Sequence, residues 1–190
     1  IASCLVGSEM CIRDRYYNDL YDIYHDYEGM NNIKTINDNA GIQPVKVDEE
    51  IIELLKLGIT MDEKTDGNMN IAMGSVLSIW HDYREAGSED PYSAELPPMD
   101  ELERAAEHTD IHNIVIDEEE STVYLTDPDM SLDVGSIGKG YAVQKVAEYA
   151  KNELGIQYML FSVGGNVCAI GGHPDGSAWA VGIQNPDVES

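Results

Sequence analysis

The residues best suited to chemistry are Asp133 and Lys139, which flank a turn punctuated by glycine. A short strand-like run ends at Asp133, and from Tyr141 onward apolar residues recur every three or four positions, which predicts a helix. A strand, a glycine turn and a helix bring backbone N–H groups and a positive helix end against an anion. The turn is not a Walker A loop, because Asp133 stands where that loop has glycine. The stretch therefore indicates a phosphate or carboxylate site, or alternatively a turn that only tightens a strand–helix joint.

The charge of the chain restricts its partners. It has 36 acidic and 11 basic residues, which gives a formal net charge of −25. A surface this negative repels nucleic acid and anionic membranes, so we expect neither to be a main partner. An anionic ligand can bind only where a lysine, a helix end or a metal ion overcomes this field. The sequence contains no apolar run long enough to span a membrane as a helix.

The first half of the chain is predicted to be mainly helical. Apolar residues spaced as on one helix face predict helices at residues 15–27 and 47–65, the second with Asp48 as its N-cap. Residues 31–41 are rich in turn formers and predict a break between them. A short charged helix is expected at residues 99–108.

The second half carries the strands. Residues 113–117 and 121–127 are β-rich runs joined by three glutamates, which predicts a hairpin. Further strands are expected at residues 157–163, 167–171 and 178–184. Helices followed by hairpin-type strands are typical of an α+β fold. We therefore expect a helical first half and a mixed, largely antiparallel sheet in the second half.

Two stretches carry a family resemblance. Asp133 begins the pattern D-x-G-x-x-x-K-G-Y, which ends at Tyr141 and precedes the predicted helix. This pattern resembles the signature of the ApbE family, the FAD:protein FMN transferases. Residues 67–84 resemble the segment that lies along the flavin site in that family. Met69 stands where the family usually has Phe, and Asn70 where it usually has Asp.

Three further stretches follow the same family in order and spacing. Tyr27 is followed ten residues later by Asn37, just before an Ala-Gly turn. Residues 164–166 (Gly-Gly-Asn) and 179–186 also resemble family segments. The resemblance covers about residues 16–186 and implies an α+β fold of the ApbE type. Without the family, Tyr27 is a residue of an amphipathic helix and Asn37 a turn former.

The resemblance implies a group-transfer reaction. In the family, FAD is split at its pyrophosphate, and the FMN half is joined to a threonine hydroxyl of a target flavoprotein through a phosphoester bond. The transition state spreads negative charge over the phosphoryl oxygens, so catalysis is mostly positioning and cationic stabilisation. Mg²⁺ bridges the pyrophosphate oxygens in the family. FAD as substrate, Mg²⁺ and a flavoprotein partner with an acceptor threonine are therefore expected.

The positions of the motifs assign the site. Ser136 would place an oxygen on the metal, and no residue is assigned as catalytic. The implied cofactor-binding residues are Tyr27, Asn68, Met69, Asn70, Asp133 and Lys139. Each has a structural alternative as a turn residue, a charge at a helix N-terminus or a core side chain. Trp80 closes the motif of residues 67–84, and its structural alternative is packing in the core. His81 and Arg84 are expected to lie on a helix surface.

A second pair of possible metal ligands is not supported by its surroundings in the sequence. His108 and His112 are four residues apart and could chelate a metal on one helix. The sequence places a turn between them and offers no third ligand beside them.

The ends of the chain depart from the family. Two later family segments, one of which supplies the remaining metal ligands, do not occur before Ser190. We therefore expect a truncated chain that is poorly active alone. A non-catalytic FAD-binding protein of the same fold is the alternative.

Residues 1–15 are expected to be a leader or a non-native segment, because residues 1–4 resemble a lipobox and residues 3–15 resemble an adapter read-through. Residues 16–190 are expected to form a partial ApbE-like flavin transferase domain. Family members are mostly exported lipoproteins anchored at the cell membrane, and the same location is expected here.

Overall fold

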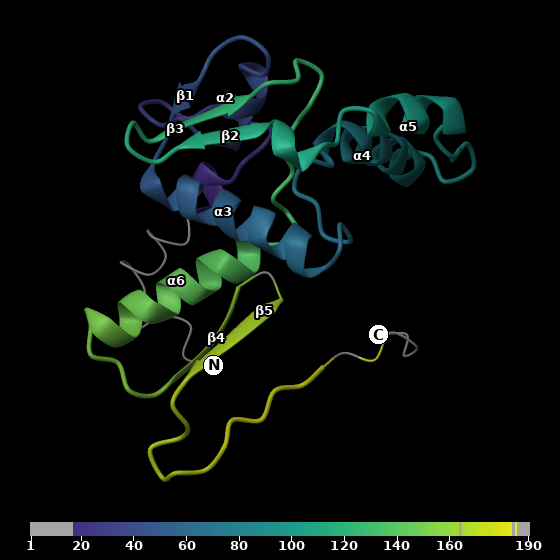
Figure 1. The fold of residues 1–190 in the computed structure, drawn as a ribbon. Coiled ribbons are helices and arrows are strands. Elements are labelled where there is room, and N and C mark those ends of the chain that lie inside the picture. The colour runs from purple at the N-terminus through teal and green to yellow at the C-terminus, as the bar shows by residue number, and fades with distance from the viewer. Residues whose placement is uncertain (1–16, 164, 184, 186–190) are drawn as a thin grey trace. The chain divides into compact units, whose positions relative to one another are not determined.

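The computed structural model describes residues 17–163, 165–183 and 185 (Figure 1). The chain divides into two compact units, and the boundary lies between Gly138 and Lys139. The described strands form one three-stranded and one two-stranded sheet, in which every pairing is antiparallel. The predicted α+β class is confirmed, although the strands form two sheets rather than one. The predicted boundary between residues 15 and 16 lies outside the described residues.

The larger unit contains the three-stranded sheet. Its strands are β1 (Val45–Lys46), β2 (Ile114–Asp117) and β3 (Thr122–Leu125), in the order β1-β3-β2. The predicted hairpin is confirmed, because β2 and β3 pair antiparallel from Ile114 opposite Leu125 to Asp117 opposite Thr122. Val123 and Leu125 are buried while their neighbours in β3 are only half-buried, as expected for a strand with one face on the core.

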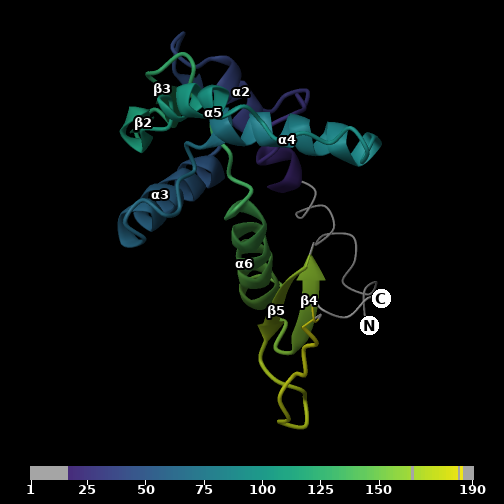
Figure 2. The same cartoon turned by 90° about the vertical axis from the view of Figure 1, so that its right-hand side faces the viewer.

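The larger unit also contains helices that follow or flank the strands of this sheet. They are α2 (Ile33–Asp38), α3 (Glu49–Lys64), α4 (Gly74–Glu89) and α5 (Met99–Ala106). The predicted cap of α3 is confirmed, because Asp48 accepts a hydrogen bond from the Glu50 N–H at 3.0 Å. Helices α4 and α5 lie side by side and extend beyond the end of the sheet (Figures 1 and 2). No described helix is both long and apolar enough to cross a membrane.

The helix predicted over residues 15–27 ends early. In the described residues it stops at Leu20, and Tyr27 instead forms an isolated bridge with Met30. The cause is Asp22, whose Oδ1 accepts hydrogen bonds from the backbone N–H groups of Tyr24 at 2.7 Å and His25 at 3.1 Å. A short acidic side chain that binds the following backbone competes with the helix, so the chain turns here.

The break predicted at residues 31–41 is also wrong, because it contains α2. Asn32 is fully buried and caps this helix, accepting a hydrogen bond from the Thr35 N–H at 3.0 Å. The Thr35 hydroxyl accepts from the Asn32 N–H in return, which completes a capping box. These two hydrogen bonds stabilise a helix that is too short to show a clear apolar period in the sequence.

Gly58 in the middle of α3 has a packing role. A Cβ atom at this position would lie 2.6 Å from Cδ1 of Ile71, a fully buried residue. Glycine costs a helix interior about 1 kcal/mol relative to alanine. Here the missing side chain lets the segment before α4 approach the helix closely.

The smaller unit contains α6 (Gly138–Asn152, with its first residue at the unit boundary), β4 (Met159–Val163) and β5 (Asn166–Ile170). The predicted helix and both strands are confirmed. The core of this unit consists of Ala147, Ala150 and Ile170, with Ile156, Met159, Phe161 and Cys168 packed against them. The strand predicted at residues 178–184 is not formed, because the chain from 178 to 183 makes no strand pairing within the described residues; position 184 lies outside them.

Candidate functional site

The segment before the glycine turn is an extended loop held by Asn37, not the predicted strand. The Asn37 Nδ2 group donates to the Leu132 carbonyl at 3.0 Å, and the Leu132 N–H donates to Asn37 Oδ1 at 2.8 Å. One carboxamide thus satisfies both backbone groups of a residue that is 1% exposed. Asn37 lies in α2 and is therefore not a turn former.

The same loop is bonded to the segment that precedes α4. The Gly74 N–H donates to the Ser131 carbonyl at 3.0 Å, and the Asp133 N–H donates to the Ile71 carbonyl at 2.9 Å. A Cβ atom on Gly74 would lie 2.5 Å from the Ser131 hydroxyl oxygen, so only glycine fits this approach. We call the meeting point of Asn37, residues 71–74 and residues 131–133 the junction. It brings together three stretches that are far apart in the sequence.

The junction leads directly into the glycine turn. Asp133 Oδ1 accepts a hydrogen bond from the Gly135 N–H at 2.7 Å, and the Val134 carbonyl accepts from the Gly138 N–H at 2.7 Å, where α6 begins. The predicted order of glycine turn and helix is therefore confirmed. Ser136 is exposed in the turn. Lys139 is exposed in the first turn of α6 and belongs to the smaller unit, whereas Asp133 belongs to the larger one.

Asn70 binds the backbone of its own loop and that of a second segment 39 residues further along the chain. Its Nδ2 group donates to the Thr109 carbonyl at 2.8 Å, and its Oδ1 accepts from the Ala72 N–H at 2.7 Å. An ionised aspartate could accept from Ala72 but could not donate to Thr109. The amide at position 70 therefore has a structural use that an aspartate would lack.

The two residues before Asn70 are fixed by the end of α3. Asn68 is exposed, and its Nδ2 group donates to the Thr65 carbonyl at 2.6 Å. The Met69 N–H donates to the Thr65 hydroxyl oxygen at 3.0 Å. The structure thus orders the segment 68–70 through its own contacts, and its predicted role in binding a flavin stays a prediction.

Tyr27 is fixed by an acidic partner. Its hydroxyl donates to Asp22 Oδ2 at 2.7 Å, and this bond raises the pKa of Tyr27 to about 12. Burial alone would raise the pKa of Asp22, but hydrogen bonds from Tyr24, Tyr27 and His25 outweigh it and hold that pKa below its usual value. Tyr27 thus remains protonated, with its ring held in one orientation and half-buried.

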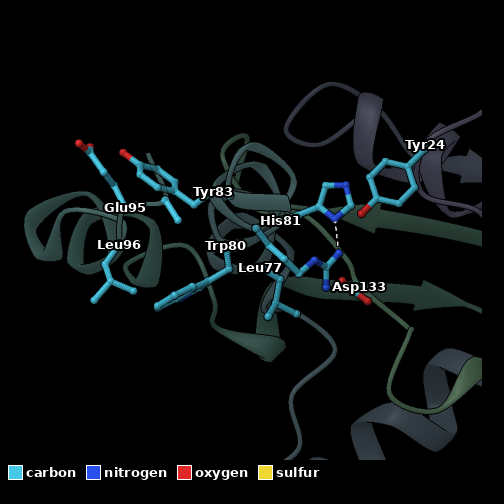
Figure 3. A pocket seen from close by; sticks show the side chains of 11 residues that line it. Tyr24, Leu77, Trp80, His81, Tyr83, Glu95, Leu96 and Asp133 are labelled. Atoms are coloured by element: carbon cyan, nitrogen blue, oxygen red, sulfur yellow. Dashed lines mark hydrogen bonds between the residues drawn. The ribbon is translucent and has the colours of Figure 1, made fainter. Parts of the chain in front are cut away.

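A cavity of about 510 Å³ opens beside Asp133 in the larger unit (Figure 3). Of the cofactor-binding residues implied by the motifs, Asp133 is the one that lines it. The lining residues are Tyr24, Leu77, Trp80, His81, Tyr83, Arg84, Gly87, Ala94, Glu95, Leu96 and Asp133. Trp80 lines this cavity and is 43% exposed, so it does not take its structural alternative of packing in the core. Aromatic walls with a few polar groups are typical of sites for planar ligands.

The wall formed by α4 was missed by the sequence analysis. The ring of His81 stacks on that of Tyr24 with centroids 5.2 Å apart, and Arg84 Nη2 donates to His81 Nδ1 at 2.7 Å (Figure 3). Leu77, Trp80, His81 and Arg84 follow the spacing i, i+3, i+4, i+7. This spacing places them on one helix face, and it is the sequence pattern from which the wall could have been predicted.

The structure does not join the two histidines considered for a metal. Helix α5 ends at Ala106, before His108, and His112 lies in the short 3₁₀ helix Ile111–Asn113. In the described part of the chain, the group of three potential ligands close enough to share an ion is His108, Asp127 and Asp129, with ligand atoms within 4.8 Å of one another. Asp133 does not belong to this group, and the predicted role of Ser136 as a metal ligand stays a prediction.

His108 and Asp127 form an ion pair. The His108 Nδ1 atom lies 2.9 Å from Asp127 Oδ2, and the hydrogen bond raises the pKa of His108 and lowers that of Asp127. This pair ties the end of α5 to the loop that leads to the junction.

Comparison with known proteins identifies the family. Residues 11–190 match the sequence profile of the ApbE family. The chain is similar to the FAD:protein FMN transferase of Escherichia coli K12, with 26% identity over 152 residues that cover 79% of this chain and 42% of that protein. It is similar to the Vibrio cholerae enzyme of the same name, with 24% identity over 176 residues that cover 93% of this chain and 50% of that protein. The chain thus spans about half the length of these curated relatives or less.

Solved structures share the fold. A mutant of the flavin transferase ApbE from Vibrio cholerae superposes with a TM-score of 0.77 at 22% identity, covering 94% of this chain and 57% of that one. The ApbE protein from Thermotoga maritima superposes with a TM-score of 0.77 at 24% identity, covering 96% of this chain and 56% of that one. The match of nearly the whole sequence and the agreement in fold lead to one conclusion: the chain belongs to the ApbE family.

Proposed function

We propose that this protein is an FAD:protein FMN transferase. The observation that carries the proposal is that motifs of the ApbE family, separated by tens of residues, meet at the junction beside the Asp133 cavity. Relatives named FAD:protein FMN transferase support the reaction class. Because the chain spans about half of their length, the activity is a proposal for the whole protein.

The proposed reaction is a phosphoryl transfer. A threonine hydroxyl oxygen of the target flavoprotein forms a bond to the phosphorus on the FMN side of FAD. The bond between that phosphorus and the bridging oxygen breaks, AMP leaves with the bridging oxygen, and the hydroxyl proton is released. The product is FMN joined to threonine by a phosphoester bond. Little covalent chemistry is asked of the protein, so positioning of the two substrates is its main contribution.

The residues beside the cavity suit FAD. Tyr24 and Trp80 offer aromatic faces for a planar ring, and Asp133 offers the carboxylate oxygen that the turn leaves free. The remaining residues implied by the motifs do not line this cavity, and we keep them as proposals from the motifs alone. Lys139 at the start of α6 is the proposed cation for the pyrophosphate. The residues proposed for the flavin are Tyr27, Asn68, Met69 and Asn70.

We propose that Mg²⁺ binds together with FAD, and we assign no reaction step to it. When bound, it would neutralise charge on the pyrophosphate oxygens. The Ser136 hydroxyl would supply one oxygen, as the motif implies.

The test is FAD binding by the 190-residue chain, with and without Mg²⁺, followed by fluorescence. We expect saturable binding that Lys139→Ala weakens about tenfold, which corresponds to roughly 1.4 kcal/mol. Lys151→Ala is the matched control, because Lys151 is an exposed lysine in the last turn of the same helix. Absence of saturable binding by the folded chain, or equal weakening by both substitutions, would contradict the proposal.

A non-catalytic FAD-binding protein is the second candidate. It is favoured by Asn70, whose amide is used by the backbone at a position where the family usually has aspartate. Incubation of the full-length protein with FAD and a flavoprotein acceptor separates the two candidates. Covalent FMN on a threonine, with release of AMP, supports the transferase. Bound FAD that stays intact supports the carrier.

We also propose that the protein works outside the cytoplasmic membrane as an anchored lipoprotein. The resemblance to exported family members supports this location. Cell fractionation with surface proteolysis tests it, and recovery of the native protein in the cytoplasmic fraction would contradict it.

A further inference from the structure

Arg84 is a cation without a carboxylate partner on the cavity wall. It is exposed on α4, and within the described residues no carboxylate lies within 4.0 Å of its guanidinium nitrogens. This is unexpected in a chain with 36 acidic and 11 basic residues. The Arg84 guanidinium donates a hydrogen bond from Nη2 to His81 Nδ1 at 2.7 Å.

The bond to His81 fixes both side chains. A guanidinium can only donate, so His81 Nδ1 must be the acceptor. The opposite ring nitrogen, Nε2, lies 3.0 Å from Glu85 Oε1. The His81 ring is thus held between Arg84 and Glu85 while it stacks on Tyr24. It uses one N–H of Arg84 and leaves the rest of the guanidinium fork available for an anion.

The surroundings of Arg84 select an aromatic ligand. Tyr24, Trp80 and Tyr83 line the same cavity as Arg84, so planar surfaces and a guanidinium lie around one space. Figure 3 shows the three aromatic residues. The net charge of −25 repels anions from most of the protein. A ligand with a planar ring and a negatively charged group would gain both from stacking and from a charge-assisted hydrogen bond.

We propose that Arg84, oriented by His81, binds a phosphate of the flavin nucleotide in the cavity beside Asp133. This inference rests on the proposed function and deepens it, because it names an anion-binding residue on α4 in addition to Lys139. His81 acts as a positioning residue, since its contact is with Arg84 and not with the ligand.

The test compares three ligands and four proteins. FAD, FMN and riboflavin are titrated into the 190-residue chain and into its variants Arg84→Gln, Arg84→Lys and Arg104→Gln. Riboflavin has the same ring system but no phosphate. Arg104 is the matched control, because it is an exposed arginine on α5 that pairs with Asp100, so its loss changes the net charge equally.

We expect Arg84→Gln to weaken FAD binding about tenfold. Riboflavin binding should change less than about twofold, because Arg84 is proposed to contact only the phosphate. Arg84→Lys keeps the charge but loses the fork, so it should lie between the parent chain and Arg84→Gln. Arg104→Gln should bind all three ligands like the parent. A loss for FMN as well as FAD assigns the FMN phosphate to Arg84, and a loss for FAD alone assigns the adenosine-side phosphate.

Three results would overturn the inference. They are unchanged FAD binding by Arg84→Gln, an equal loss for riboflavin, or an equal loss in Arg104→Gln. Failure of the parent chain to bind any flavin would overturn the proposed function as well, which separates the two claims. Thermal unfolding of each variant shows whether it is folded, and Arg84→Lys provides the test if Arg84→Gln is not.

Discussion

The junction and the cavity wall lie next to each other in the larger unit, but their residues are held in different ways. At the junction, the half-buried Asn37 bonds to the backbone of Leu132, which lies 95 positions away and is buried. On the cavity wall, Tyr24 is 54% exposed and Trp80 is 43% exposed. This difference indicates two roles. The junction fixes the position of Asp133, whereas the exposed side chains of the wall are available for the proposed ligand.

The two regions should differ in the free-energy cost of a substitution. Leaving a buried backbone group without its hydrogen bond costs about 1–3 kcal/mol. Changing an exposed side chain away from such features usually costs less than about 0.5 kcal/mol. Substitutions at the junction should therefore change stability first, and substitutions on the wall should change binding first.

Asn37→Ala should have the largest effect on stability. It removes the partners of both the N–H and the carbonyl of buried Leu132, which should lower the free energy of unfolding by about 2–4 kcal/mol. Urea denaturation measures the change. Asn31→Ala is the control, because Asn31 is exposed and donates a single hydrogen bond, to the Lys46 carbonyl. Equal costs for the two variants would remove the proposed distinction.

Gly74→Ala should have the second largest effect on stability. The added Cβ would meet the Ser131 hydroxyl oxygen at 2.5 Å and the Ser131 carbonyl oxygen at 2.6 Å, so the two segments must separate. Overpacking of this kind costs about 1–3 kcal/mol. Gly140→Ala is the matched change in α6, where the nearest atom lies 3.8 Å away, and it should be neutral or slightly stabilising. A Gly74→Ala chain as stable as the parent would show that the junction is not closely packed.

Asn70→Asp should lower stability by about 1–2 kcal/mol at neutral pH. The substitution keeps the acceptor for Ala72 but turns a carboxylate oxygen toward the Thr109 carbonyl. Asn68→Asp is the matched control on an exposed residue, and we expect a smaller cost there. Thermal unfolding of both variants checks this, and a stabilising Asn70→Asp would contradict the structural use of the amide.

The His108–Asp127 pair should give a smaller, pH-dependent effect. The pKa of His108 is raised, so its contribution is complete below the unfolded value of about 6.5 and is lost as the pH rises through the folded pKa. The pKa of Asp127 is lowered, so its contribution is present above the unfolded value of about 3.9 and is lost as the pH falls through the folded pKa. The pair therefore stabilises most between about pH 4 and 6.5.

His108→Gln tests this sign. The stability difference between the parent and the variant should be larger at about pH 5.5 than at about pH 8. His112→Gln, at an exposed histidine, serves as the control. A difference that grows toward high pH would contradict the pairing.

Tyr24→Phe should change stability least, by less than about 0.5 kcal/mol. The ring that stacks on His81 is kept, and only the hydroxyl of an exposed residue is removed. Denaturant unfolding checks the value, and a cost comparable to that of Asn37→Ala would place the wall in the same class as the junction.

The sequence predicted the parts of the fold that depend on local patterns. Helix α3 with its Asp48 cap and the hairpin β2–β3 follow from apolar spacing and from turn residues. The helix predicted over residues 15–27 was wrong because the side chain of Asp22 competes for the backbone. Helix α2 was missed because its stability comes from the cap at Asn32 rather than from an apolar period.

The candidate site was predicted only in part for a related reason. The motif identified Asp133, and the structure places it on a cavity. Neither the bond from Asn37 to Leu132 nor the stack of Tyr24 on His81 follows from local spacing, because each joins elements far apart in the sequence. The helical spacing of Trp80, His81 and Arg84 was visible, but it did not show that a cavity faces them.

The central claim is that a flavin binds in the cavity beside Asp133, against Trp80. The chain has two tryptophans, so Trp179→Phe leaves Trp80 as the only one. The measurement is the emission of Trp80 in this variant during titration with FAD. We predict a saturable loss of Trp80 emission with the same midpoint as the change in FAD fluorescence. Unchanged Trp80 emission while FAD is bound would place the flavin elsewhere and would contradict the account.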